Sequence, residues 1–426
     1  MKLLLFTGVI FIFSAISFAG NIDILGIRSA DYLMELSRNA VTDNADGVTY
    51  NPAVLAFIED GIHLNFGAQY IGKDYTITGT LLGTTEEIEL TTDKSTPFIP
   101  NFYAVYKINK IAAFGGFNIP AGGGTLDYQD GLFIMPLLQT ALVQAQFGPN
   151  HIAMLNEGSM EGTSFYMRGI GGVAYAFNEK FSGAIAGRYT TGHRNYKGQG
   201  SFAVIDLATG QPIGEVAAEL DVDREATGLS GVLSFHYRPA NNLNLALRYE
   251  TATALEFEST ANVVSTWDAV MPFLADGAKQ RRDLPAVVAI GVDMQVNPEF
   301  RLGGSANYYF IEEADQGDDD GINDAYKDGW EANISGRYQF NPAFAGAIGY
   351  SYSNYGGCDT TYTDLEYNLN AGLLSGGVNW QANNTYDFTL AGGTTFFEEG
   401  EGIGMYSGET FDKSVFFLAF GANASF

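Results

Sequence analysis

Gly61-Ile62-His63-Leu64-Asn65-Phe66-Gly67-Ala68-Gln69-Tyr70 is the stretch that decides the fold. Apolar side chains alternate with small or polar ones along it, and this period of two predicts a β-strand with one apolar and one polar face. The same alternation returns at 286–296, 330–340 and 386–390. A chain built from many such strands needs an apolar environment on one side of its sheet and a polar one on the other.

The alternation predicts about fourteen strands. Their expected ranges are 62–78, 96–107, 111–120, 161–177, 180–200, 213–237, 242–260, 284–296, 299–313, 327–339, 343–354, 371–382, 385–397 and 412–426. Most approach or exceed the roughly 9–11 residues that cross a bilayer, and short turns alternate with long loops between them. We therefore predict an all-β fold, a transmembrane antiparallel β-barrel of about fourteen strands with helical extracellular loops. A soluble β-sandwich and a β-solenoid are the alternatives.

Composition and the two chain ends indicate the location. The net charge of -27 argues against nucleic acid as a partner. Residues 1–19 are predicted to be a signal peptide that is removed, because Lys2 precedes an apolar run and Ser17-Phe18-Ala19 resembles a cleavage site. The single Cys358 rules out an internal disulfide. The amphipathic last strand ends in Phe426, like the signal read by the outer-membrane assembly machinery, so we predict the bacterial outer membrane.

Residues 20–60 precede the first strand and sustain no amphipathic period. Near their end stands Asn51-Pro52-Ala53, after the polar stretch 44–50. Asn suits a helix N-cap and Pro the first helical position, so a short helix is expected over Pro52–Ile58. We predict that residues 20–60 form a plug, here named the hatch, inside a barrel of residues 61–426. An ordinary turn before the first strand is the alternative.

Two loop segments are too apolar for ordinary solvated loops. The first, 132–144, is predicted to be a helix with Pro136 in its first turn. The second begins at Ser265, a predicted N-cap with Asp268 three residues later. The residues expected to catch a hydrophobic ligand are Phe133, Ile134, Leu137, Leu138, Trp267, Met271 and Phe273. The alternative is that both helices only pack as a lid over the barrel mouth.

The third strand is predicted to be a weak ladder. Its unusual residues are Gly115, Gly116, Phe117, Asn118, Pro120 and Gly122. Proline cannot donate a hydrogen bond to a ladder, and glycine clusters mark bulges or a close approach of backbone. A broken ladder here would open a lateral gap in the barrel wall. The alternative is a strand end that runs into a flexible loop.

Strand parity points several charged side chains into the lumen. These are Arg168, Arg188, Arg248, Arg301 and Arg337, together with Glu250, Asp293 and Glu331. Arginine binds carboxylates through two parallel hydrogen bonds, so Arg168, Arg188, Arg248 and Arg337 are candidates for holding an anionic head group. Pairing with the lumenal acids to hold the hatch is the alternative role.

The sequence gives little support to catalysis, and we predict no cofactor and no dedicated metal site. The four histidines form no H-E-x-x-H pattern, and G-x-S-x-G is absent from the sequence. The acidic loop 315–324 partly resembles a calcium loop, but Gln316 and Lys327 stand at the first and last ligand positions. We therefore expect a solvated loop there, with weak divalent-ion binding left open, and we predict that the protein is not an enzyme.

These motifs together resemble the FadL/TodX-like family of outer-membrane long-chain fatty-acid and hydrocarbon transporters. The segment 43–53, with its Asn-Pro-Ala triplet, is similar to the family's hatch motif, and Arg282-Asp283-Leu284-Pro285 and Tyr326-Lys327-Asp328 resemble further family positions. The resemblance implies a fourteen-stranded barrel with an N-terminal hatch. It implies capture of a hydrophobic ligand by extracellular loops and exit through a gap at a kink in the third strand. It places Asn51-Pro52-Ala53 near that gap, in contact with 117–124.

The functional hypothesis is therefore passive transport of long-chain fatty acids or similar hydrophobic molecules across the outer membrane. The expected partners are the hydrophobic ligand, outer-membrane lipid and lipopolysaccharide, and the barrel-assembly machinery during biogenesis, with a monomeric barrel and no cofactor. A general aqueous porin and a structural or adhesive barrel are the competing hypotheses. The sequence leaves open whether the ligand is a fatty acid, an alkane or an aromatic hydrocarbon.

Overall fold

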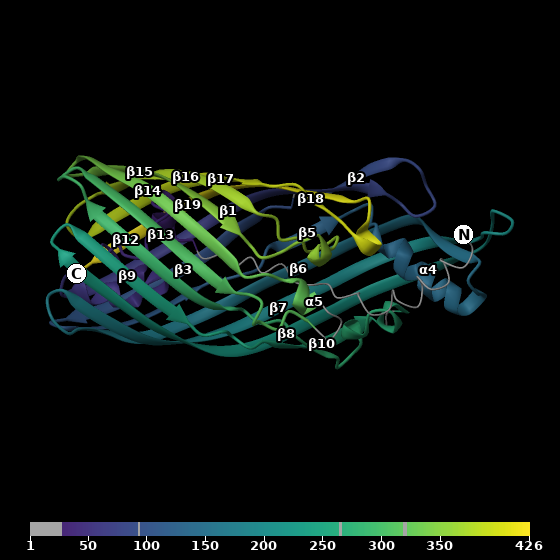
Figure 1. Cartoon of the computed structure of the whole chain (residues 1–426), viewed down its shortest axis with the longest axis horizontal. Coiled ribbons are helices and arrows are strands. Elements are labelled where there is room, and N and C mark those ends of the chain that lie inside the picture. The colour runs from purple at the N-terminus through teal and green to yellow at the C-terminus, as the bar shows by residue number, and fades with distance from the viewer. Residues whose placement is uncertain (1–27, 93, 264–265, 318–321) are drawn as a thin grey trace.

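Fourteen antiparallel strands close into a barrel in the computed structural model, which describes residues 28–92, 94–263, 266–317 and 322–426 (Figure 1). In wall order these strands are β1 (Gly61–Thr80), β3 (Thr96–Ile108), β4 (Ile111–Asn118), β6 (His151–Ala176), β7 (Phe181–Asp206), β8 (Gln211–Ala240), β9 (Leu243–Glu250), β12 (Ala286–Gln295), β13 (Phe300–Phe310), β14 (Gly329–Asn341), β15 (Phe344–Asn354), β16 (Ala371–Gln381), β17 (Tyr386–Phe397) and β19 (Thr410–Ser425).

Pairing between the first and last strands closes the wall. β1 and β19 run antiparallel from the pair His63↔Ser425 to the pair Thr78↔Thr410. Closure leaves neither strand as an open sheet edge, where unpaired N–H and C=O groups would be exposed to lipid. The predicted barrel of about fourteen strands is thus confirmed.

Short strands and helices sit at the loop end of the barrel. The strands are β2 (Glu87–Thr92), β5 (Gly124–Tyr128), β10 (Glu256–Val263), β11 (Lys279–Arg281) and β18 (Gly400–Glu401). The helices are α4 (Ile134–Phe147), α5 (Ile322–Ala325) and the 3-10 helices η4 (Thr266–Ala269), η5 (Pro272–Leu274), η6 (Asp359–Thr361) and η7 (Gly404–Tyr406). Among the described residues, no helix has the length and apolar character needed to cross a membrane.

Several predicted bounds were wrong. β6 and β7 contain 26 residues each and extend beyond the loop-side ends of the predicted 161–177 and 180–200, whereas β8 agrees with the predicted 213–237 to within a few residues. The predicted strand 242–260 is two strands, β9 and β10, separated at 251–255. The helix expected from Ser265 is the pair η4 and η5, and Ser265 itself lies outside the described residues. Polar residues on the long strands masked their continuation beyond the apolar belt.

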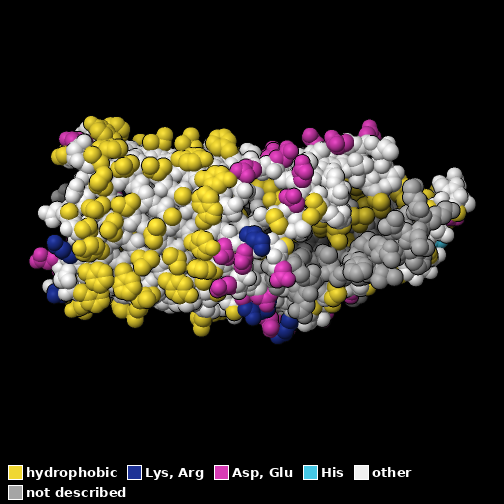
Figure 2. All heavy atoms as spheres, in the orientation of Figure 1, with side chains coloured by type: hydrophobic (Ala, Val, Ile, Leu, Met, Phe, Trp, Pro, Cys, Tyr) yellow, Lys and Arg dark blue, Asp and Glu magenta, His cyan; other side chains and the backbone are white. Residues whose placement is uncertain are grey.

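An apolar belt surrounds one half of the barrel. Figure 2 shows hydrophobic side chains covering the half with the short turns and acidic side chains beginning at its border. Leu229, Ile185 and Ile348 on this belt are more than half exposed. A bilayer crossing takes roughly 9–11 residues per strand, so β6, β7 and β8 project far beyond the belt toward the loop end.

The described part of the hatch fills the lumen within this belt. It comprises α2 (Ala30–Met34), α3 (Gly47–Tyr50) and the 3-10 helix η3 (Pro52–Phe57), and it ends where β1 begins at Gly61 (Figure 1). α2 lies against β16, β17 and β19, whereas η3 lies against β6, β7 and β8. The predicted helix after Asn51 is therefore present. The predicted signal peptide, 1–19, lies outside the described residues.

Candidate functional site

The hatch triplet is bonded to the barrel wall. The Asn51 side chain accepts from the Ala53 N–H at 3.1 Å and caps η3, while its Nδ2 donates to the Phe235 carbonyl at 3.2 Å. The Ala53 N–H also donates to Ser234 Oγ, and Ser182 Oγ donates to the Ala53 carbonyl at 2.7 Å. These polar contacts join Asn51-Pro52-Ala53 to β7 and β8.

The hydrogen bond between the hatch and the third strand is made two residues before the triplet. Asn118 Nδ2 donates to Thr49 Oγ1 at 3.0 Å and to the Tyr103 hydroxyl at 3.1 Å. The apolar side of η3, including Val54 and Leu55, packs in one cluster with Phe114 of β4. The hatch therefore meets the third strand and β7–β8 on the same side of the lumen.

The third strand loses its regular ladder after Asn118. Gly115, Gly116 and Phe117 pair on both sides, with β3 and with β6, so the prediction that the weak ladder includes them is wrong. Their small or outward side chains fit a regular pleat, and the disruption starts where Pro120 lacks an N–H.

Beyond that point the wall holds extra residues. Between the pairs Asn118↔Arg168 and Gly124↔Ser164, the five residues 119–123 face the three residues 165–167. Among the described residues, β5 pairs with β6 across this part of the wall, and β3 pairs with β4 no further than Phe102↔Phe117. Gly122 adopts φ +105°, and a Cβ there would lie 2.5 Å from the Phe165 Cα. We name 119–123 the third-strand break.

Three predicted lumenal arginines gather around one acid and one hatch carbonyl. Arg168 Nη1 lies 3.0 Å from Glu250 Oε1, and Arg188 Nη1 pairs with Glu250 Oε2. Arg188 Nη2 and Arg248 Nη1 donate to the Thr49 carbonyl at 3.0 and 2.6 Å. All four side chains are buried. This set, the hatch cluster, carries three guanidinium groups and one carboxylate.

The remaining charged residues predicted to face the lumen mostly tie down the hatch. Arg301 pairs with Glu35, at 3.0 Å from Nε to Oε1, and lies 3.5 Å from Asp293. The Tyr32 hydroxyl donates to Glu331 at 3.0 Å. Arg337 is half-buried and donates to Asn379 Oδ1 at 3.4 Å, so it lies apart from the hatch cluster.

The hatch cluster lines a cavity that reaches the third-strand break. Arg168, Arg248 and Glu250 share its lining with Pro120 and Ala121 of the break. Arg28 lines both this cavity and a second one beside Gly122 and Gly123, where Phe397 and Phe417 supply apolar walls. Polar and apolar surfaces thus meet at the break.

The apolar loop residues predicted to catch a ligand come together beneath α4. Phe133, Ile134, Leu138, Trp267, Met271 and Phe273 are buried in one cluster, and Leu137 packs against it partly buried. Trp267 Nε1 donates to Gln139 Oε1 at 3.1 Å and joins η4 to α4. Leu138, Trp267 and Met271 line a small cavity with only apolar and tyrosine side chains around it.

Shared lining residues show that these cavities are neighbours. The cavity beneath α4 and a middle cavity share Tyr196 and Leu365, and the middle cavity shares Tyr75 and Gly123 with the one beside the break. Their volumes run from about 10 to about 80 Å³, so side chains must move before a larger molecule can pass.

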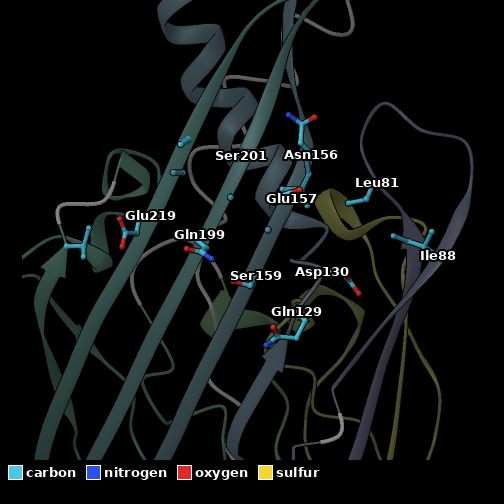
Figure 3. Close-up of a pocket in the computed structure, with 16 residues that line it drawn as sticks. Leu81, Ile88, Gln129, Asp130, Asn156, Glu157, Ser159, Gln199, Ser201 and Glu219 are labelled. Carbon is cyan, nitrogen blue, oxygen red and sulfur yellow. The ribbon is translucent and has the colours of Figure 1, made fainter.

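A wide groove opens at the loop end. Its volume is about 1050 Å³. Figure 3 shows Leu81 and Ile88 of the β1–β2 hairpin on one side and Ser159, Gln199 and Glu219 of β6–β8 on the other. More polar side chains line this groove than line the cavity beneath α4.

Comparison with known proteins identifies the fold. No protein-family model matches the chain, and no curated protein matches it. A solved FadL homologue of Pseudomonas aeruginosa aligns with 94% of this chain and 98% of its own, with a TM-score of 0.68 and 14% identity. The chain has the FadL fold. The sequence resemblance is therefore confirmed at the level of the fold.

Two further structures share the FadL fold with this chain. The P. putida toluene transporter TodX aligns with 96% of this chain and 98% of its own, at a TM-score of 0.64 and 13% identity. The Ralstonia pickettii toluene transporter TbuX aligns with 94% of this chain and 98% of its own, at a TM-score of 0.63 and 14% identity. None of the three is described as an enzyme.

Some residues of this FadL-fold site were missed from the sequence. Tyr75 could have been found, because parity along β1 places it on the lumenal face. Arg28 and Leu365 carry no such signal, since one lies in the hatch and the other in an irregular loop. Only the tertiary structure places them beside the cavities.

Proposed function

We propose that this chain transports long-chain fatty acids or similar hydrophobic molecules passively across the bacterial outer membrane. The observation that carries the proposal is the series of cavities that runs from the apolar site beneath α4 to the third-strand break inside a plugged barrel. The toluene transporters TodX and TbuX share the fold, which supports a hydrophobic ligand.

In this mechanism the ligand enters at the loop end and displaces side chains of the apolar cluster beneath α4. It then moves through the middle cavity to the third-strand break and leaves sideways into the membrane. Lateral exit suits a hydrophobic molecule, because the polar hatch cluster below the break opposes passage of an apolar chain. The ligand's concentration gradient drives each step.

The hatch cluster has two roles in this proposal. Arg188 and Arg248 bind the Thr49 carbonyl and hold the hatch in place. Arg168 and Arg248 also line the cavity next to the break, where they would hold an anionic head group through paired hydrogen bonds. In this proposal the apolar loop residues bind the hydrophobic ligand first. They are Phe133, Ile134, Leu137, Leu138, Trp267, Met271 and Phe273.

A two-residue deletion tests lateral exit. Removing Pro120 and Ala121 leaves three residues opposite 165–167, so the ladder can continue from Asn118 to Gly124 without a bulge. We expect uptake of labelled oleate into vesicles containing the protein to fall to the level of empty vesicles. The matched control deletes Thr84 and Thr85 from the exposed β1–β2 loop and should transport normally. Full uptake by the folded Pro120–Ala121 deletion would rule out exit through the break.

A further inference from the structure

One joint of the barrel wall is held by side chains instead of backbone hydrogen bonds. On the loop side of the third-strand break, β2 and the first part of β3, residues 96–101, pair with β1, whereas β5 pairs with β6. Among the described residues, no backbone ladder joins β5 to β2 or to 96–101. We name this joint, between β5 and the β2–β3 segment, the seam.

The residues along the seam suit two strand edges that face each other without pairing. Pro100 has no N–H to donate, and a proline within a strand is tolerated mainly at an edge. On the other side, Gly122 and Gly124 adopt φ +105° and +73°, so the chain leaves regular strand geometry just before β5. The backbone groups on both edges therefore need partners other than a neighbouring strand.

Side chains from β2 and the residues after it supply such partners. Lys94 Nζ donates to Asp127 Oδ2 at 3.2 Å and to Glu161 Oε2 at 2.8 Å, which ties the β2–β3 segment to both β5 and β6. The Asp127 N–H donates to Thr92 Oγ1 at 3.0 Å. We name Lys94, Asp127 and Glu161 the clasp.

The clasp is the exposed part of the seam. The side chains of Lys94, Asp127 and Glu161 are 46%, 24% and 34% exposed. Exposed ion pairs contribute little stability and are screened by salt. On the inner side, the buried Lys73 of β1 donates to the Gly123 carbonyl of the break and lines the cavity beside it. The seam thus has a weak outer fastening directly above the third-strand break.

Separation at the seam would break no ladder bond. β5 stays paired with β6, and residues 96–101 stay paired with β1, when the two sides move apart. The break would then widen upward into a slit. Phe98, on the edge of 96–101, is 60% exposed, so one lip of this slit already presents an apolar surface to the outside. A slit lets a long apolar chain leave along its length, without threading end-on through the break.

We propose that the clasp of Lys94, Asp127 and Glu161 controls lateral exit. While the clasp is closed, the seam is shut; when it releases, β5 parts from the β2–β3 segment and the ligand leaves through the slit. This role rests on the proposed transport function and goes beyond it, because it assigns the control of exit to three exposed side chains.

Hydrogen exchange at the Asp127 amide reports seam opening directly, since this N–H bonds across the seam. We expect Lys94→Gln to exchange about two- to fivefold faster than the parent, as the loss of exposed ion pairs predicts. Lys94→Arg keeps the charge and should exchange like the parent. Initial uptake of labelled oleate into vesicles should rise in Lys94→Gln by a similar factor.

Lys279→Gln is the matched control. Lys279 is 55% exposed and lies 3.3 and 3.4 Å from Glu256 and Glu258, so it also joins two acids. A backbone ladder between β10 and β11 holds the wall at that place. The variant should therefore match the parent in Asp127 exchange and in uptake.

Salt separates an ionic clasp from a packing role. Raising the salt concentration from about 0.01 to about 0.15 M shortens the screening length from about 30 to about 8 Å. We expect Asp127 exchange in the parent to become faster with salt and exchange in Lys94→Gln to change little. Equal salt dependence in the two proteins would overturn the clasp.

A disulfide across the seam tests the slit itself. A Cβ on Gly124 would lie 3.5 Å from the Thr96 Cβ, which is within the range for a disulfide. In a Cys358→Ser background, oxidised Thr96→Cys, Gly124→Cys should take up oleate no faster than empty vesicles, and a reductant should restore uptake. The positive φ of Gly124 strains a cysteine there, so the Lys94 variants provide a test that does not depend on this disulfide.

The outcomes separate the clasp from transport. Full uptake by the oxidised double cysteine variant would overturn the slit, and Asp127 exchange or uptake unchanged in folded Lys94→Gln would overturn control by the clasp. Both results leave transport standing as long as the parent takes up oleate. No uptake by the parent would remove the transport function and the control of exit with it.

Discussion

Glu250 shows how a single side chain can join the hatch to the wall. It accepts from Arg168 and Arg188, and Arg188 in turn donates to the Thr49 carbonyl of the hatch. A buried ion pair adds modest net stability, because desolvation offsets most of its attraction. Removing one partner is different, since it leaves buried charge without compensation.

Glu250→Ala should therefore destabilise the barrel strongly. It leaves three buried guanidinium groups without their carboxylate, and we expect a loss of about 3–5 kcal/mol in the free energy of unfolding. Urea unfolding in lipid vesicles measures the change. Glu225→Ala, whose side chain is 80% exposed, is the matched control and should shift the value by less than about 0.5 kcal/mol. Equal effects in the two variants would show that Glu250 does not anchor the hatch.

At the scale of elements, α4 depends on a distant loop for its N-terminus. Asp364 accepts from the Ile134 N–H, although the two residues are 230 positions apart. Glu409 hydrogen-bonds to Asp364, and burial together with that neighbouring carboxyl raises the pKa of Glu409 well above its ordinary range. Burial also raises the pKa of Asp364. We expect the folded contact of Asp364 and Glu409 with α4 to hold a proton, which is released at neutral pH when α4 opens and exposes the two carboxyls.

The stability of α4 should fall as the pH rises. A carboxyl with a raised folded pKa contributes stability that is fully present below its ordinary pKa of roughly 4.5 and is lost as the pH rises through the raised value. We expect hydrogen exchange of the α4 amides, corrected for intrinsic rates, to show protection falling by up to about 1.4 kcal/mol per pH unit above about pH 5.

Glu409→Gln tests the origin of this slope. The amide keeps a neutral hydrogen-bonding group beside Asp364 and cannot titrate, so the slope should flatten. Glu399→Gln, on an exposed position two residues after β17, is the control and should keep it. A slope that persists in Glu409→Gln would mean that other groups control the lid.

The third-strand break is also a property of an element. Five residues opposite three form a bulge that no single side chain creates, and Gly122 permits it through its positive φ. The position of the bulge decides where the wall is weakest. It lies next to the two cavities that Arg28 lines, so the proposed lateral route would pass beside the hatch cluster.

At the scale of the whole molecule, the hatch spans the lumen from β16, β17 and β19 to β7 and β8. Bonds on the two sides hold it, such as Thr389 Oγ1 to Asp31 at 2.6 Å and Ser182 Oγ to Ala53 at 2.7 Å. We therefore expect this closed barrel to conduct ions poorly, unlike a general porin of similar strand number.

Planar-bilayer recordings distinguish these two kinds of barrel. We expect no steady single-channel conductance from the wild-type protein and a steady conductance after deletion of residues 20–60. The Thr84-Thr85 deletion serves as a control for disturbance at the barrel rim and should stay closed. Steady conductance of the wild-type protein would favour the porin alternative over the transport proposed here.

The sequence by itself determined those features of the protein that depend on residues close together in the chain. Alternation with a period of two depends only on neighbouring residues, so Gly61–Tyr70 predicted a strand. The recurrence of this alternation along the chain predicted the fourteen-stranded wall. Asn51-Pro52 predicted its helix because a cap acts over two or three residues. Parity likewise pointed Arg168, Arg188 and Arg248 into the lumen.

Only the tertiary structure decided which of these residues act together. Arg188 hydrogen-bonds to Thr49, which is 139 residues away in the sequence, and Asp364 hydrogen-bonds to Ile134 of α4, which is 230 residues away. Neither contact therefore has a local sequence signal. The start of the break after Asn118 depended on the register with β6, which a single strand cannot specify. The closed barrel fixes that register and brings Lys94 to Asp127 and Glu161, because strand closure and loop packing set distances that the sequence leaves free.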